Sequence, residues 1–328
     1  MADRKYGELK PELVKLLKDY ERLYFREGRP VPFIPESNLF LYPAQVRDFE
    51  EFAACSSCLT LNKNDDPRGV TMSHLDYLLS KIAPTEPEAR VWRYKIQRLF
   101  EIVFRLQVGY ECTTCHTVIP YNSQEAKTFL EQCQAYAHAL QERMAGAQVE
   151  LPPEPRLKCK NAQCSGTKFQ HSFDIREDPT TKKMHIFIHG HDLTKNEFNQ
   201  LRQIVLFQNL PDYADDSWRN SDIRKDHDEA MRLKQQSQDL HATIEQKVIC
   251  LAITSNYKIP EIYDMPIRQF TMALTRVDDL INYKLLQQAK YSGMSSIPSD
   301  FKIPHWIYQP DTDSYDDMYK DVDSFQSV

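Results

Sequence analysis

Glycine is scarce in this sequence, with 8 residues among 328. Neither G-x-G-x-x-G nor G-x-x-x-x-G-K-[ST] occurs. Such loops hold nucleotide phosphates because glycine lets backbone N–H groups approach the phosphate oxygens closely. The commonest nucleotide-binding signatures are therefore missing, and we do not expect nucleotide hydrolysis.

Long apolar runs and an excess of positive charge are also lacking. No run approaches the roughly 20 apolar residues that span a bilayer, and the N-terminal "MADRKYGELK" lacks the apolar core of a signal peptide. The net charge of −6 gives no overall attraction for nucleic acid. We therefore expect a protein that is made in a cytosol and has no membrane partner. We do not expect it to bind nucleic acid.

Catalytic signatures are equally sparse. The sequence contains no H-E-x-x-H, no G-x-S-x-G and no paired-carboxylate frame. We expect no enzymatic activity.

The N-terminal part has the periodicity of helices. Leu13, Leu17, Tyr20 and Tyr24 recur at helical spacing until Gly28, and "MSHLDYLLSKI" and "ARVWRYKIQRLFEIVFRL" are amphipathic. The segment "NLFLYPAQVRDFEEFAACSSCLTL" predicts a short strand followed by a helix. We expect a helical N-terminal domain over residues 1–105.

The periodicity changes after residue 105. The segments "RLQVGYEC", "HTVIPYN", "RLKC", "KFQHSFDI" and "MHIFIHG" alternate between apolar and polar residues, as half-buried strands do. A stretch rich in helix formers, at about residues 123–148, interrupts them. Residues 106–193 are therefore predicted to form a small antiparallel β module with an inserted helix.

Helical spacing returns in the C-terminal part, which we expect to be a helical domain over residues 194–308. Its longest predicted helix has Asp264 as N-cap, Gly293 as its end, and apolar residues three and four apart: Ile267, Phe270, Leu274, Val277, Ile281 and Leu285. The whole chain is thus predicted to be α+β and mainly α-helical.

Residues 309–328 form an acidic tail with six aspartates and one lysine. Tyr315, Tyr319 and Phe325 lie among these charges, and the segment is too polar to make a core of its own. Two interpretations stand: a solvated, flexible tail, or a segment whose aromatic residues become buried against a partner.

The eight cysteines include three close pairs, and in a reducing compartment such pairs indicate metal ligands or buried thiols. Cys112 and Cys115 have two residues between them, and Cys159 and Cys164 have four. Zinc takes four thiolates from two such turns. We predict one structural zinc ion per chain on these four residues, as in a zinc ribbon, against the alternative of two unrelated buried pairs.

The other cysteines are interpreted differently. Cys55 and Cys58 fall in a predicted helix without the Gly or Pro of a redox motif. We favour a buried structural pair, with zinc binding or redox chemistry as alternatives. Cys133 and Cys250 are expected to be core residues on apolar helix faces.

Several histidines lie near these features. His185, His189 and His191 would suit a catalytic metal if a carboxylate joined them, but an exposed strand edge followed by a turn is the favoured interpretation. His116 and His171 could replace a cysteine in the metal site or shield it.

Several segments resemble proteins of tailed bacteriophages. "YKIPEIYDMPIRQFTMALTRVDDLINYKLLQQAKYSGM" followed by "IPHWIY" resembles the closing segment of tail and baseplate proteins. "YECTTCHTVI", "LKCKNAQC" and "FQHSFDI" are similar to the cysteine-pair element of baseplate hub subunits and hub-assembly proteins of contractile-tailed phages, and "FLYPAQVRDFEEFAACSSCLTLNK" is also similar to proteins of this group.

This resemblance implies a non-enzymatic role in building the baseplate hub. The partners would be hub, wedge or tube subunits, and the location would be the virion tail, after assembly in the host cytoplasm. The alternative is a cytosolic zinc-ribbon protein that binds nucleic acid or a polymerase, for which "RLKCKNAQCSGTKFQH" supplies basic residues and "HTVIPYNSQ" supplies none. A metallohydrolase built on the histidines is a third class.

Overall fold

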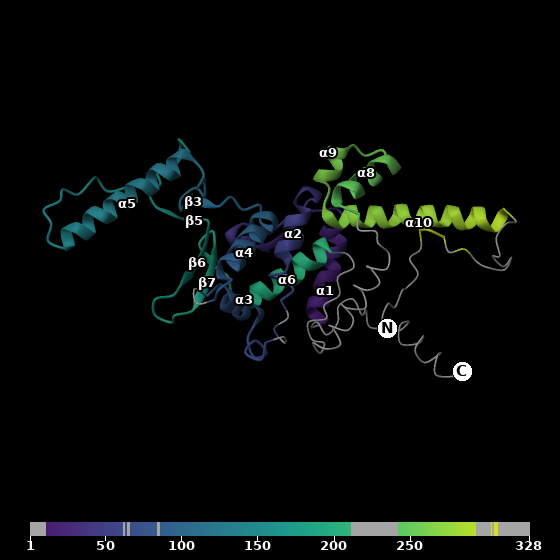
Figure 1. The fold of residues 1–328 in the computed structure, drawn as a ribbon, viewed down its shortest axis with the longest axis horizontal. Helices are drawn as coiled ribbons and strands as arrows, with labels where there is room; N and C mark the ends of the chain where they lie inside the picture. The colour runs from purple at the N-terminus through teal and green to yellow at the C-terminus, as the bar shows by residue number, and fades with distance from the viewer. Residues whose placement is uncertain are drawn as a thin grey trace. The chain divides into compact units, whose positions relative to one another are not determined.

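The structure is a computed structural model of the chain (Figure 1), and it describes residues 11–61, 63, 66–83, 86–210, 242–292, 303 and 305–307. These residues are mainly α-helical and carry small antiparallel sheets, so the predicted α+β class is confirmed. The predicted helix end at Gly293 and the acidic tail, residues 309–328, lie outside the described residues. None of the described helices is both long and apolar enough to cross a membrane.

The chain forms two compact units. Unit 1 contains residues 1–240 and 266–268, and unit 2 contains residues 241–265 and 269–328. The four-part division of the sequence stays a prediction. Among the described residues, the helix that follows residue 193 belongs to the core of unit 1.

The helices of unit 1 are α1 (Pro11–Tyr20), continued by the π-helical turn η2 (Glu21–Phe25), α2 (Phe49–Ser56), α3 (His74–Ile82), α4 (Ala89–Val103) and α6 (Lys195–Asn209). Side-chain caps mark the starts of α3 and α6: Ser73 accepts a hydrogen bond from Asp76 N–H, and Thr194 with Glu197 forms a capping box.

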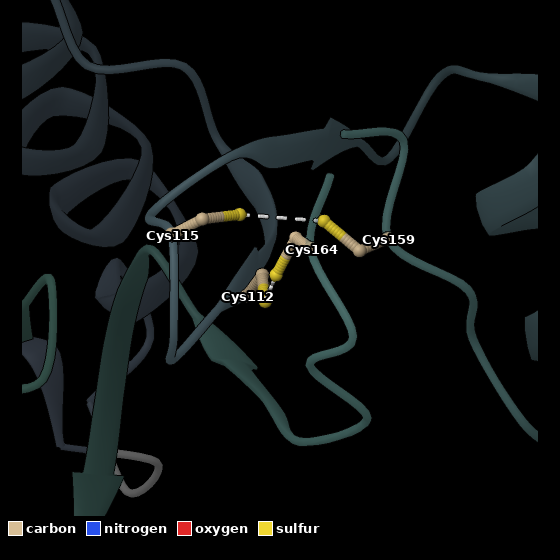
Figure 2. Close-up of side chains that lie close together, drawn as sticks. All are labelled: Cys112, Cys115, Cys159 and Cys164. Carbon is tan, nitrogen blue, oxygen red and sulfur yellow. Dashed lines mark hydrogen bonds between the residues drawn. The ribbon is translucent and has the colours of Figure 1, made fainter. Parts of the chain in front are cut away.

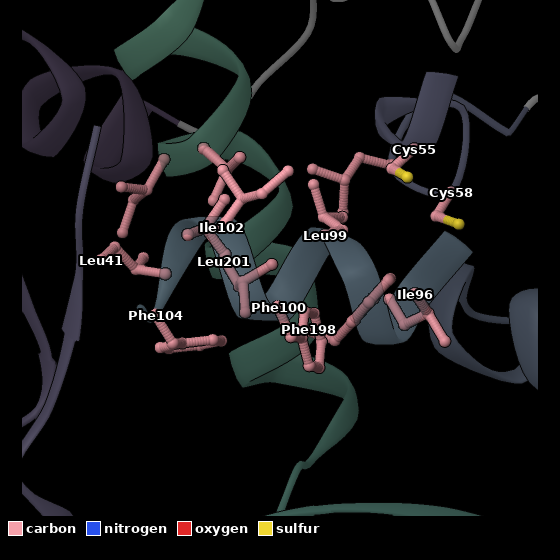
Figure 3. Close-up of a cluster of buried hydrophobic side chains, with 14 of the residues drawn as sticks. Leu41, Cys55, Cys58, Ile96, Leu99, Phe100, Ile102, Phe104, Phe198 and Leu201 are labelled. Carbon is pink, nitrogen blue, oxygen red and sulfur yellow. The ribbon is translucent and has the colours of Figure 1, made fainter. Parts of the chain in front are cut away.

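The core of unit 1 lies between α4 and α6. Phe100 and Leu99 of α4, and Phe198 and Leu201 of α6, have no exposed surface (Figure 3). Phe173 of the β module also belongs to this cluster, with its ring centroid 5.7 Å from that of Phe100. The helices and part of the β module thus share one core.

A hairpin precedes α2. Strand β1 (Val31–Ile34) pairs antiparallel with β2 (Leu39–Leu41). The predicted strand before the 49–56 helix is therefore present as β2, and β1 is an additional strand. Asn38 makes the turn with φ 52°, in the left-handed region that asparagine tolerates better than most residues.

The β module contains two three-stranded antiparallel sheets. The first has the order β4-β3-β5, with β3 at Gly109–Cys112, β4 at Val118–Pro120 and β5 at Phe169–His171. The second has the order β6-β7-β8, with β6 at Phe173–Glu177, β7 at Met184–Ile188 and β8 at His191–Asp192. The inserted helix is α5 (Gln124–Met144), which Ser123 caps.

One predicted strand is wrong. The segment "RLKC", residues 156–159, has no strand, because β5 occupies the edge of β3 that this segment would need. Its apolar residue Leu157 instead packs in a small cluster with Ile119 and Ala126.

Unit 2 contains α8 (Ile244–Thr254), α9 (Ile259–Asp264) and most of α10 (Ile267–Tyr291). The prediction that Asp264 caps α10 is wrong. Pro260 near the start of α9 favours a separate short helix, which ends at Asp264, and α10 begins three residues later.

Candidate metal centre

The first cysteine pair occupies a tight turn between β3 and β4. Cys112 N–H donates to Thr117 O at 3.0 Å, and His116 N–H donates to Cys112 O at 2.9 Å. His116 closes the turn with φ 59°. These bonds bring the Cys112 and Cys115 side chains to the same side of the turn.

The second pair lies in irregular chain between α5 and β5. Cys164 N–H donates to Asn161 O at 2.9 Å, which closes a turn between the two cysteines. Pairing of Cys112 with Phe169, and the bond from Thr113 N–H to Lys168 O at 3.1 Å, fix this segment beside the first turn. The β3–β5 ladder therefore positions one pair against the other.

The four sulfurs meet in one cluster (Figure 2). Cys112 Sγ lies 3.8 Å from Cys164 Sγ, and Cys115 Sγ lies 3.4 Å from Cys159 Sγ. All four sulfurs are within 4.8 Å of one another, and none forms a disulfide. A tetrahedral zinc site with Zn–S bonds of about 2.3 Å has sulfurs about 3.8 Å apart. The four cysteines could therefore bind a metal ion.

Backbone N–H groups point at every one of these sulfurs. The backbone N–H two residues after each cysteine acts to lower the pKa of that thiol: Thr114 for Cys112, Thr117 for Cys115, Asn161 for Cys159 and Gly166 for Cys164. Gly166 N–H donates to Cys164 Sγ at 3.3 Å. Hydrogen bonds to a charged sulfur favour the thiolate, which is the form that binds metal. The donor set and its surroundings thus fit a thiolate-bound cation.

The pKa values of the clustered thiols reflect how closely the four sulfurs are packed. The hydroxyl and N–H of Thr117 lower the pKa of Cys115 to about 6. Gly166 N–H lowers the pKa of Cys164, but its sulfur neighbours, Cys115 first, raise it more, to about 12. All four thiols can ionise together only if a positive charge lies among them, which a divalent cation supplies.

The histidines near the cysteines do not join the cluster. His116 Nδ1 lies 2.8 Å from a carboxylate oxygen of Glu111, and His171 Nδ1 bonds the Tyr121 hydroxyl. Neither replaces a cysteine ligand in this arrangement.

The three clustered histidines each contact a different carboxylate. His185 pairs with Asp192 at 2.9 Å, His189 with Glu111 at 2.9 Å, and His191 with Glu197 at 3.1 Å. Within the described part of the chain, the only group placed closely enough to hold a metal is the set of four cysteines. The structure does not bring these histidines together as a metal site.

Glu111 is the residue of this region that sequence reasoning missed. Its side chain is buried on β3 beside Cys112, and it accepts hydrogen bonds from His116, His189 and Gln170. Burial alone would raise the pKa of Glu111, but the bonds from His189 and His116 lower it below its ordinary value. The carboxylate links the first cysteine turn to the β7–β8 turn. A lone glutamate in an alternating strand gave no signal of this.

Cys55 and Cys58 form a buried pair on and just after α2, each 2% exposed, within the core of unit 1 (Figure 3). Burial raises the pKa of Cys58 to about 12 and also raises that of Cys55. Neutral thiols of this kind are poor nucleophiles and poor metal ligands, which agrees with the structural interpretation.

The prediction that Cys250 is a core residue is wrong. Cys250 is exposed because α8 buries the side that carries Val248 and Leu251. Cys133 is half-buried on α5.

We expect Cys250 to react with iodoacetamide much faster than Cys55 and Cys58 in the folded protein at pH 8. The thiolate is the reactive form, and burial keeps Cys58 protonated until the pH approaches 12. Peptide mass spectrometry after timed labelling measures the three rates, and labelling in denaturant provides the control in which all three should react. Equal rates in the native protein would contradict the buried pair.

We expect Gly166→Ala to weaken metal binding by roughly 10–100-fold. A Cβ at this position would lie 2.7 Å from Cys112 Sγ and 2.8 Å from Thr114 Oγ1, so the sulfur would have to move. Competition with a chromophoric chelator measures the affinity. Ser165→Ala, at the exposed neighbouring position, is the matched control and should bind metal as the unchanged protein does. Unaltered affinity in Gly166→Ala would contradict the close packing at the centre.

The fold and the site define an α+β protein with a four-cysteine cluster compatible with zinc. Residues 234–309 match the family model described as the YomV second domain, a phage-associated domain. The matched range includes α8, α9 and α10 and does not include the four cysteines. Comparison with curated proteins and with solved structures finds no match.

Proposed function

We propose that the protein is a structural component or assembly factor of a bacteriophage tail baseplate, in its hub region, and that it has no catalytic role. The observation that carries this proposal is the match of residues 234–309 to a phage-associated domain. The resemblance of the cysteine-pair element to hub and hub-assembly proteins supports the finer assignment.

The four cysteines would hold one zinc ion. Four thiolates fill the tetrahedral coordination of zinc and leave no position for a substrate or an activated water. In this proposal the metal fixes the β3–β4 turn to the chain around Cys159 and Cys164, and so gives the β module a defined surface. Gly166 allows the close approach, and the four backbone N–H groups stabilise the thiolates.

The proposed partners are other baseplate or tail proteins, namely hub, wedge or tube subunits, with no membrane partner. The proposed location is the virion tail, after assembly in the host cytoplasm. The tail at residues 309–328 is a candidate partner segment, because its aromatic residues lie among acidic ones and could bind an apolar groove with a basic rim.

The test is a conditional knockout of the gene in the phage that encodes it. We expect infected cells to produce heads but no complete baseplates, and mass spectrometry of purified baseplates or their precursors to detect the chain. Complete baseplates made without the protein would exclude this role. A plasmid-borne gene carrying Cys250→Ser, a change outside the four-cysteine cluster, should restore baseplate assembly in the knockout. This rescue is the control for expression from a plasmid.

Nucleic-acid binding by the β module is the second candidate. Lys158 and Lys168 flank the second cysteine pair and are exposed, whereas Lys160 is neutralised by Glu125 at 3.4 Å. This candidate would be favoured if the unchanged protein is retained on heparin and the substitutions Lys158→Glu and Lys168→Glu abolish that retention. We expect elution at low salt, because two free lysines release few counterions from a polyanion.

A further inference from the structure

One apolar stripe of α10 begins buried and continues into solvent. Ile267 and Phe270, at the start of the helix, are 1% exposed. With the same spacing of three and four residues, the stripe continues through Leu274, Val277, Ile281 and Leu285. Ile281 is 43% exposed and Leu285 is 57% exposed. We call these last four residues the α10 stripe. An apolar stripe of this kind stabilises a helix when another surface covers it.

The described part of unit 2 buries few apolar side chains. Among its described residues, the buried apolar side chains are Val248, Leu251, Ile262 and Phe270. The exposed large apolar side chains are more numerous: Ile249, Ile253, Tyr257, Ile259, Met272, Ile281, Leu285, Tyr291 and Ile307. Exposed apolar side chains that gather on one face of a helix indicate an interaction site.

The chain that returns to α10 contacts a different face of the helix. His305 packs on Tyr283 with ring centroids 5.1 Å apart, and Arg276 donates to Trp306 O at 3.1 Å. At about 100° per residue, Tyr283 and Arg276 lie roughly 140–160° around the helix from Ile281. This contact therefore leaves the α10 stripe open.

The charges beside the stripe specify the kind of partner. The stripe itself carries no charge. Asp278 lies about 60° from Ile281 on one side, and Lys284 about 60° on the other. Within the described residues, neither side chain has an ion-pair partner. A helix with one acidic and one basic flank complements a parallel copy of itself, because each acidic flank then faces a basic one. An antiparallel copy would bring like flanks together.

We propose that the α10 stripe is a self-association surface that pairs in parallel with the same stripe of a second copy of this chain. The pairing is isologous: Ile281 lies beside the partner's Ile281, and the Asp278 flank of each copy faces the Lys284 flank of the other. This inference goes beyond the proposed function and stands without it, since its test needs only the purified full-length protein.

Light scattering coupled to size exclusion tests the association. We expect the full chain to show twice its mass of 38.5 kDa, and the variant Ile281→Glu with Leu285→Glu to show the mass of one chain. Met272→Glu is the matched control, because Met272 is 45% exposed and lies on the opposite face of the same helix. A single-chain mass for the unchanged protein, or a double mass that persists in the Ile281→Glu, Leu285→Glu variant, would overturn the proposal.

Charge exchange tests whether the partner is a copy and whether it runs parallel. We expect Asp278→Lys and Lys284→Asp each to weaken association by roughly tenfold, and the two changes together to restore it. Gln288 lies one heptad beyond Ile281, so the cysteine of the Gln288→Cys variant should form a cross-link with the same cysteine of a second copy. The cysteine of the Asp279→Cys variant, on the back of the helix, should not. Failure of the double exchange to restore association, or equal cross-linking at both positions, would overturn parallel self-pairing. Circular dichroism confirms that each variant is folded.

Discussion

Replacing Cys112 and Cys159 together with serine is expected to remove zinc from the protein and to unfold the irregular chain that carries the second cysteine pair, residues 157–168. Each turn would lose one of its two sulfur ligands. Structural zinc sites contribute apparent binding free energies of about 10–16 kcal/mol, whereas the buried residues of the local apolar cluster are only Ile119, Ala126 and Leu157. Such a small cluster cannot replace that contribution.

Elemental analysis and hydrogen exchange measure this result. The unchanged protein should hold one zinc ion per chain and the double variant none, with faster exchange across residues 157–168. Chelation of the unchanged protein should have the same effect, and the exposed Cys250→Ser is the control. The helical core of unit 1 should remain, because the four cysteines lie outside it. Absence of zinc from the unchanged protein, or its retention in the double variant, would contradict the site.

Phe100→Ala is expected to lower the free energy of unfolding of unit 1 by about 3–5 kcal/mol. Phe100 is fully buried, and its ring meets Phe104 of the α4 end at 5.3 Å and Phe173 of β6 at 5.7 Å. Truncation of the Phe100 side chain leaves a cavity between the helices and the β6-β7-β8 sheet. The helices and this sheet should therefore lose stability together.

Denaturant unfolding followed by circular dichroism measures this loss. Tyr94→Ala on the same helix, at a side chain 61% exposed, is the control and should change the stability by less than about 1 kcal/mol. An equal effect of the two substitutions would mean that Phe100 does not join the helices to the β module.

Local patterns were sufficient to predict most helices and the meeting of the four cysteines in one cluster. The helices at α3, α4 and α5 follow from spacing and from caps such as Ser73 and Ser123, which act within one turn. The four cysteines could be grouped because the chemistry of zinc demands four ligands from short turns, whatever the length of chain between them.

Features that depend on distant contacts could not be predicted in this way. The role of Glu111 requires His189, which is 78 positions away, to fold beside it. The packing of α6 among the N-terminal helices depends on bonds such as Ala44 N–H to Asn209 Oδ1 across 165 positions. The exposure of Cys250 likewise depends on which side of α8 meets its neighbours, since that helix is apolar on more than one side.

The position of α5 between the two cysteine turns would affect how quickly the four-cysteine cluster binds a metal ion. Cys115 and Cys159 are separated by 44 positions, a flexible loop that costs entropy to close. A helix of 21 residues fills about half of that gap. Helices form within about a microsecond, which is faster than distant parts of a chain come together in the native arrangement. With α5 formed, fewer free residues remain to be ordered when the second turn meets the first. If the four cysteines bind zinc, the rate of uptake, and not only the affinity, would therefore depend on a segment that supplies no ligand.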